Sequence, residues 1–416
     1  MPVDTTEGME RAVGTASETQ TLVAVSAAHL VSHFYIMVLP VLLPLLKERL
    51  GVGFLDLGLA LTVFNVVTGL TQAPMGFLVD KVGARPVLIV GLVGGGLAFL
   101  SLGILTTYPW LIAVALLAGL ANCVYHPADY AILSTLSENR MARAFSVHTF
   151  AGFVGGAVAP PILLGLAAFG GLEAALLFTG LLGLATALAL LLVPIHRPAL
   201  PPPRSGQSRT GAAGGSLAGV LTPTVMGLTG FFVLIALSNS AINTFSVAAF
   251  MVTQGVSFAA ANAVLTAYLT GSAVGVLLGG SIADKVKRHG DMAAIGFGLS
   301  ALIMLLVATL DLSVLSLVLA MGLSGVIFGM VQPARDMLVR RAAPPGAAGR
   351  VFGIVSTGFN IGGIIGPLMF GWVMDHGDPR WIFYGAVLFI ALTALFGFVE
   401  ERRGSRRAAA LHSSAR

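Results

Sequence analysis

Two short stretches of this sequence nearly repeat each other: Gly76-Phe-Leu-Val-Asp80-Lys81 and Gly280-Ser-Ile-Ala-Asp284-Lys285. They lie 204 residues apart, and further matches follow at offsets of 206 and 207, where His126-Pro127 aligns with Gln332-Pro333 and Pro160 with Pro367. A nearly constant offset over about 100 residues indicates an internal duplication. The chain therefore consists of two related halves.

The composition excludes a water-soluble enzyme. Of 416 residues, 23 are Lys or Arg and 18 are Asp or Glu, so 10% are charged and 56% are hydrophobic. Soluble domains carry roughly 25% charged residues. Cys123 is the single cysteine, which also excludes a disulfide scaffold. The composition indicates a membrane protein with many spans.

Long apolar segments predict twelve transmembrane helices, because about 20 apolar residues cross a bilayer and only helices of this length satisfy their backbone in lipid. The predicted spans are 21–46, 53–79, 86–107, 109–137, 144–169, 172–194, 223–250, 257–283, 292–310, 313–338, 351–374 and 381–399. They give an N-terminal tail over 1–20, a first six-helix bundle over 21–194, a linker over 195–222, a second bundle over 223–399 and a tail over 400–416.

The basic residues predict the orientation. Only Lys47, Arg49 and Arg380 lie on one side of the predicted spans, which leaves 20 of the 23 Lys and Arg residues on the side of both termini. An excess of Lys and Arg marks cytoplasmic loops, so both termini are expected in the cytoplasm. The basic charge then reflects topology, and no nucleic-acid partner is expected. We expect a monomer in the plasma membrane, or in the inner membrane of a Gram-negative cell.

The loop from Gly76 to Arg85 resembles the signature G-x-x-x-D-R/K-x-G-R-R/K of the major facilitator superfamily, and the resemblance covers the chain between its tails. It implies two six-helix bundles with a cytoplasmic gate; the alternative for this loop is a plain topology anchor. The second copy departs from the signature, since Lys287 replaces its second glycine. The implied gate residues are Gly76, Asp80, Lys81, Gly83, Arg85, Gly280, Asp284 and Lys285.

Small residues four apart in the spans 144–169 and 351–374 predict close helix packing, and the adjacent prolines predict bends. The residues concerned are Gly155, Pro160, Gly362, Gly366 and Pro367. In the family, G-x-x-x-G-P in the fifth span marks many drug efflux antiporters. Ala159 stands at the second glycine here, so the pattern indicates either efflux or helix packing common to any transporter.

Ionisable residues at membrane depth are candidates for function. His126 and Asp129 are three apart and share a helix face, so they could bind and release a proton together; the alternative is a static hydrogen-bonded pair. The family often has an Arg at the position of Ala115, and this element of proton coupling is absent. His148 lies near the start of the span 144–169.

A second candidate pair is His29 and His33, which are four apart in the first span. They could bind substrate, make structural contacts or ligate a metal, but zinc needs three or four ligands, so no resident metal is expected, and no other cofactor. Asn239 is the repeat partner of His33. The predicted substrate cavity comprises His29, His33, Tyr35, His126, Asn239, Asn243, Gln332 and Asn360.

The segment 125–130, Tyr-His-Pro-Ala-Asp-Tyr, followed by Arg143-Ala-Phe-Ser146, resembles the fosmidomycin-resistance-like branch of the superfamily. No G-x-x-x-x-G-K-S/T loop occurs, so ATP is not expected to drive transport, and the protein is not expected to be an enzyme. The sequence favours proton-coupled efflux of a small amphipathic organic solute by alternating access. The alternatives are proton-coupled uptake of a small organic acid and a membrane receptor that does not transport.

Overall fold

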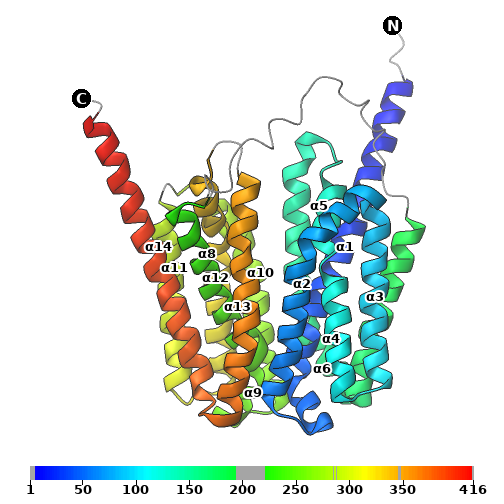
Figure 1. The fold of residues 1–416 in the computed structure, drawn as a ribbon, viewed down its shortest axis with the longest axis vertical. Coiled ribbons are helices and arrows are strands. Elements are labelled where there is room, and N and C mark those ends of the chain that lie inside the picture. The colour runs from blue at the N-terminus through cyan, green and yellow to red at the C-terminus, as the bar shows by residue number, and fades with distance from the viewer. Residues whose placement is uncertain (1–4, 194–220, 284, 287, 345–347, 415–416) are drawn as a thin grey trace. The chain divides into compact units, whose positions relative to one another are not determined.

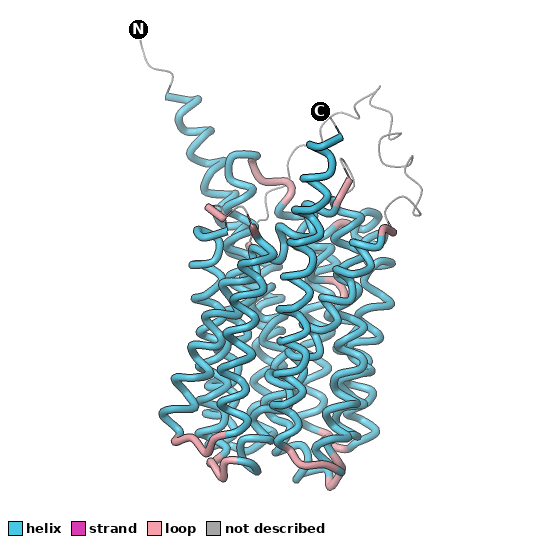
Figure 2. The backbone as a smooth tube through the Cα atoms, turned by 90° about the vertical axis from the view of Figure 1, so that its left-hand side faces the viewer, coloured by secondary structure: helices cyan, strands magenta, loops and turns pink. Residues whose placement is uncertain are grey.

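The structure is a computed structural model that describes residues 5–193, 221–283, 285–286, 288–344 and 348–414. The described residues form helices joined by short loops, and they contain no strand (Figure 2). The predicted all-helical fold is confirmed. The first helices are α1 (Thr5–Leu50), α2 (Phe54–Val82), α3 (Ala84–Ile104), α4 (Tyr108–Asn122), α5 (Tyr125–Leu133) and α6 (Glu138–Leu192) (Figure 1). The later ones are α8 (Pro223–Asn239), the π-helix η2 (Ser240–Phe245), α9 (Ser246–Thr253), α10 (Phe258–Ala283), α11 (His289–Thr309), α12 (Val314–Ala342), α13 (Ala348–His376) and α14 (Arg380–Ser414).

Eleven of the described helical segments are long and apolar enough to cross a membrane, whereas the sequence predicts twelve. The difference arises in α6, which is 55 residues long and covers the predicted span 144–169 and residues 172–192 of the next predicted span. Gly170 and Gly171 interrupt its helical geometry, and Gly171 has a φ of 72°, a conformation that favours glycine. The boundary between the two predicted spans therefore coincides with a break inside α6, and the count of twelve stays a prediction.

The span predicted over 109–137 is divided into α4 and α5 by a turn at Cys123 and Val124. Pro127 is the third residue of α5, in the first turn, where the missing N–H of proline removes no helical hydrogen bond. The turn makes α5 a nine-residue helix that carries both His126 and Asp129.

The described helices belong to two compact units. Unit 1 comprises Met1–Val38, Val66–Gly156 and Leu166–Ala213, and unit 2 comprises Leu39–Asn65, Ala157–Gly165 and Gly214–Arg416. Segments 39–65 and 157–165 lie in the first half of the sequence but pack with helices of the second half. Most of the predicted linker, 194–220, lies outside the described residues.

Glycines bring helices into backbone contact in unit 2. A Cβ atom on Gly271 of α10 would collide with the carbonyl oxygen of Gly322 in α12, and one on Gly325 with the carbonyl oxygen of Tyr268. Lipid offers no hydrophobic force between helices, so such close packing supplies much of their association. These contacts fix α10 against α12.

Candidate functional site

Four histidines and one aspartate meet inside unit 1. We call this set, His29, His33, His126, Asp129 and His148, the histidine cluster. It joins three helices: α1 carries the first two residues, α5 the next two and α6 the last. The ring centroid of His29 lies 3.8 Å from that of His148, 4.7 Å from that of His33 and 5.5 Å from that of His126. His29 is therefore the centre of the cluster.

Asp129 is fully buried in this cluster. Its Oδ2 atom lies 3.2 Å from Nδ1 of His29 and 3.5 Å from Nε2 of His148, while its Oδ1 atom has no hydrogen-bond partner in the described part of the chain. Its ion-pair contacts among the described residues are to histidines alone, not to Lys or Arg. An isolated carboxylate is costly in an apolar interior, so the aspartate needs a proton of its own or one on a neighbouring histidine. The geometry suits a group that exchanges a proton.

Two glycines of α6 admit α1 to this position. A Cβ atom on Gly152 would lie 2.9 Å from Nε2 of both His29 and His33, and one on Gly155 would collide with the carbonyl oxygen of Leu30. Gly152 is four residues after His148, so both lie on one face of α6. Gly152 thus stands directly against the imidazoles, and Gly155, which is predicted to pack helices closely, stands against the backbone of α1.

Exposure changes across the cluster. His29 and His148 are buried, His33 is half-buried and His126 is exposed. The ring of His126 also lies 5.8 Å from that of the exposed Tyr130. His126 is thus the most exposed member of the cluster, His33 is the next, and Asp129 is fully buried.

Three donor atoms of the cluster could also suit a metal ion. Ligand atoms of His29, Asp129 and His148 all lie within 4.8 Å of one another. Zinc sites have four ligands, one of them water where the site is catalytic. The set is therefore compatible with protons, and with a metal that takes three protein ligands.

Tyr35, a predicted cavity residue, packs elsewhere in unit 1. Its ring centroid lies 5.1 Å from that of Phe99, and Cβ atoms on Gly95 of α3 and Gly183 of α6 would collide with the tyrosine. Its hydroxyl is buried and has no hydrogen-bond partner within the described ranges. The structure thus places Tyr35 between α3 and α6.

The other predicted cavity residues lie in unit 2. Asn239 ends α8, and Asn243 lies in the π-helix η2; the Oδ1 atoms of both are buried, and neither has a hydrogen-bond partner among the residues that the structure describes. Gln332 is buried on α12, and Asn360 is half-buried on α13. π-Helical turns often occur at functional sites. The amides of Asn243 in η2 and of Asn239 directly before it are therefore the candidate polar site of unit 2.

The predicted gate loop connects α2 and α3. Gly83 has a φ of 98° between the two helices, and Asp80 and Lys81 are exposed at the end of α2. Arg85 donates from one terminal nitrogen to the carbonyls of Leu190, Leu191 and Val193 at 2.9, 3.0 and 2.8 Å. A cation at a helix C-terminus satisfies free carbonyls and the helix dipole, so Arg85 caps α6.

In the second copy of this loop, Gly280 lies near the end of α10 and Lys285 is exposed in the following turn. Asp284 lies outside the described residues.

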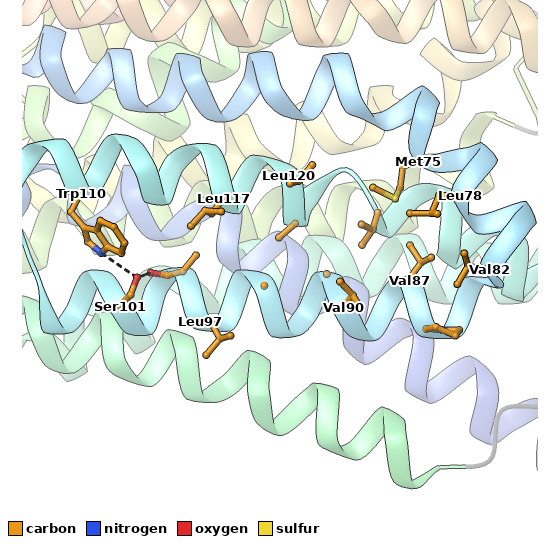
Figure 3. A pocket seen from close by; sticks show the side chains of 16 residues that line it. Met75, Leu78, Val82, Val87, Val90, Leu97, Ser101, Trp110, Leu117 and Leu120 are labelled. Carbon is orange, nitrogen blue, oxygen red and sulfur yellow. Dashed lines mark hydrogen bonds between the residues drawn. The ribbon is translucent and has the colours of Figure 1, made fainter.

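A separate pocket of about 610 Å³ lies between α2, α3 and α4 (Figure 3). Its lining is apolar apart from Ser101, whose hydroxyl accepts a hydrogen bond from Trp110 Nε1 at 3.2 Å. The lining residues Val82 and Val90 are 53% and 69% exposed, as expected for side chains that face lipid. It contains none of the predicted cavity residues, and we do not assign the solute site to it.

His148 is the member of the cluster that the predicted sites omit. Helical spacing relates residues within one helix, such as His126 and Asp129, but not residues on different helices. The structure pairs Asp129 with His29 and His148 instead, from two other helices. The position of Gly152 one turn after His148 was the available signal, because a small residue there permits close approach of a neighbouring helix.

A sequence profile of the Major Facilitator Superfamily matches residues 25–237 and 226–414, and the chain belongs to this family. The predicted family is confirmed. The multi-drug resistance efflux pump PmrA of Streptococcus pneumoniae is 26% identical over 382 residues, which cover 86% of this chain and 90% of that protein. The fosmidomycin resistance protein of Escherichia coli is 22% identical over 391 residues, which cover 91% and 92% of the two chains.

The uncharacterized MFS-type transporter YfnC of Bacillus subtilis is 25% identical over 274 residues, which cover 64% of this chain and 66% of that protein. Among solved structures, a bacterial homolog of the human lysosomal transporter Spinster aligns with a TM-score of 0.78 at 14% identity, over 93% of this chain and 97% of that one. This structural likeness supports the fold. The family and its relatives identify the chain as a multi-pass transporter of the cell membrane rather than an enzyme.

Proposed function

We propose that the chain exports a small amphipathic organic compound in exchange for protons, by alternating access. The single observation that carries proton coupling is the fully buried Asp129, which has histidines as its ion-pair partners among the described residues. The efflux direction is supported by the names of two relatives, a multi-drug resistance efflux pump and a fosmidomycin resistance protein. The receptor alternative has no support among these relatives.

In this proposal Asp129 binds the proton, His29 and His148 share it, and His126 exchanges it with water. His33 and, in unit 2, Asn239, Asn243, Gln332 and Asn360 contact the solute. The cytoplasmic termini and two spans within α6 are part of the same proposal. The break at Gly170 and Gly171 supports the two spans, since each part of α6 is then long enough to cross the bilayer.

The test uses proteoliposomes that contain a pH-sensitive dye and the purified protein. Lipophilic cations and antibiotic-like amphiphiles are added outside, and the internal pH is followed. A solute-dependent proton flux that disappears in Asp129→Asn supports the proposal. Solute flux that is identical with and without a pH gradient would show that protons are not the coupling ion.

The second candidate function is uptake of a small organic acid, which the gathering of four imidazoles favours, because protonated histidines can bind an anion. Thermal stabilisation by ligands at about pH 5.5 and 7.5, on either side of the ordinary histidine pKa, separates the two functions. Stabilisation by small carboxylates at the lower pH supports uptake. Stabilisation by amphiphiles supports efflux.

A further inference from the structure

Asp375, one residue before the end of α13, binds the first turn of α2. Its Oδ1 atom accepts a hydrogen bond from the Phe54 N–H at 2.9 Å, and its Oδ2 atom accepts one from the Leu55 N–H at 2.8 Å. Lys47 Nζ lies 3.5 Å from Oδ1 of Asp375 and 4.5 Å from the centre of the Phe54 ring. All four residues belong to unit 2, and we call them the α2 clamp.

Helix electrostatics explain why this carboxylate points to α2. A helix C-terminus carries partial negative charge, so α13 itself disfavours an aspartate at this position. A helix N-terminus carries partial positive charge and free N–H groups, and α2 offers both. Hydrogen bonds to a charged acceptor are also stronger than neutral ones. The Asp375 carboxylate, carried by the end of α13, thus binds the start of α2 and Lys47.

The clamp ends a longer contact between α2 and α13. A Cβ atom on Gly58 would collide with the carbonyl oxygen of Pro367, and one on Gly371 would lie 2.7 Å from the carbonyl oxygen of Phe54. Further along, the Thr62 hydroxyl donates to the Ile364 carbonyl at 2.9 Å. The two backbones therefore touch over several turns, and the α2 clamp closes the end of this contact.

We propose that the α2 clamp is a latch that opens once in every transport cycle, at the end of α2 opposite the gate loop. This inference rests on the proposed alternating access, which requires the two halves of the sequence to part at each end in turn. Lys47, Phe54 and Leu55 come from the first half of the sequence and Asp375 from the second. The side chains of Asp375 and Lys47 are 16% and 40% exposed, so water can replace the bonds when they break.

The test measures the separation of the two halves of the sequence at the end that carries the α2 clamp, by double electron–electron resonance between two spin labels. Labels are attached to Glu48→Cys and Asp311→Cys in a Cys123→Ser background; both labelled positions are exposed. We expect Asp375→Ala to raise the population with a longer label distance roughly tenfold, because two charge-assisted hydrogen bonds are lost. Asp378→Ala is the matched control, because Asp378 Oδ1 accepts a local hydrogen bond from the Arg380 N–H, at 2.9 Å.

Equal distance distributions in the unsubstituted protein and in Asp375→Ala, at equal thermal stability, would overturn the latch. Should Asp375→Ala fail to fold, Lys47→Gln keeps both backbone hydrogen bonds and is expected to give a smaller shift in the same direction; no shift there overturns the latch as well. The measurement needs neither solute nor protons. A protein that shows the shift and transports its solute without a proton flux would therefore refute the proposed proton coupling and still support the latch.

Discussion

Nδ1 of His29 lies 3.2 Å from Oδ2 of Asp129, although the two residues are 100 positions apart in the sequence. One residue lies on α1 and the other on α5, and His148 adds a contact from α6. Displacement of any of these helices would change the surroundings of the aspartate. Proton binding and helix movement are thereby linked through one buried carboxylate.

Asp129→Asn is expected to remove the pH dependence of transport and to lower the solute-driven proton flux at least tenfold. The amide keeps the size of the carboxyl group but cannot bind or release the proton. The dye-loaded proteoliposomes measure this flux. Asp311→Asn, at a side chain that is 89% exposed, should leave it unchanged. Retained pH dependence in Asp129→Asn would assign the coupling to another residue.

Gly152→Ala is expected to slow transport severalfold without removing an ionisable group, because its methyl group would lie 2.9 Å from Nε2 of His29 and of His33. The imidazoles must then shift. Gly156→Ala, one turn away on α6, is the matched control, since the added methyl group would come no nearer than 4.0 Å to Met37 Cγ. The measurement compares the transport rates of the two variants at equal protein content. Equal rates would mean that the positions of the imidazoles do not limit transport.

Gly155→Ala is expected to lower the free energy of unfolding by about 1–3 kcal/mol, the usual cost of overpacking. Its methyl group would collide with the backbone carbonyl of Leu30, which cannot move without moving α1. Gly165→Ala on the same helix has open space around it and should change little. Unfolding in mixed micelles with increasing SDS measures the free energy of unfolding of both variants. An unchanged free energy of unfolding in Gly155→Ala would contradict the close contact of α1 and α6.

Arg85→Ala is expected to lower the free energy of unfolding by about 1–2 kcal/mol, because it leaves three carbonyls at the end of α6 without their donor. Arg85→Lys should recover only part of this, since an ammonium group is a compact point donor rather than a planar fork. Lys81→Ala, at the exposed neighbouring charge, is the control. The same SDS titration gives the free energies of unfolding of these three variants. Full recovery by lysine would indicate that only the charge of Arg85 matters.

Much of the fold follows from the sequence, because the lipid interior requires helices and the repeated gate loop relates the two halves. The split of the fourth span is harder to predict, since His-Pro in this sequence fits a bent helix as well as a turn. The pairing of Asp129 with His29 and His148 needs the rotation and depth of three helices, which no single-helix period contains. The α2 clamp joins residues more than 300 positions apart, beyond the reach of local patterns.

Segment 39–65 belongs to unit 2 although it precedes the predicted linker by more than 100 residues. A gene divided at the linker would therefore produce two polypeptides that each lack packing partners found in the other. The first fragment would expose Gly58 and the start of α2 to lipid, and the second would leave Asp375 without the N–H groups that it binds. Split versions for complementation assays or biosensors should consequently be made by co-expression of both fragments, not by mixing fragments purified separately.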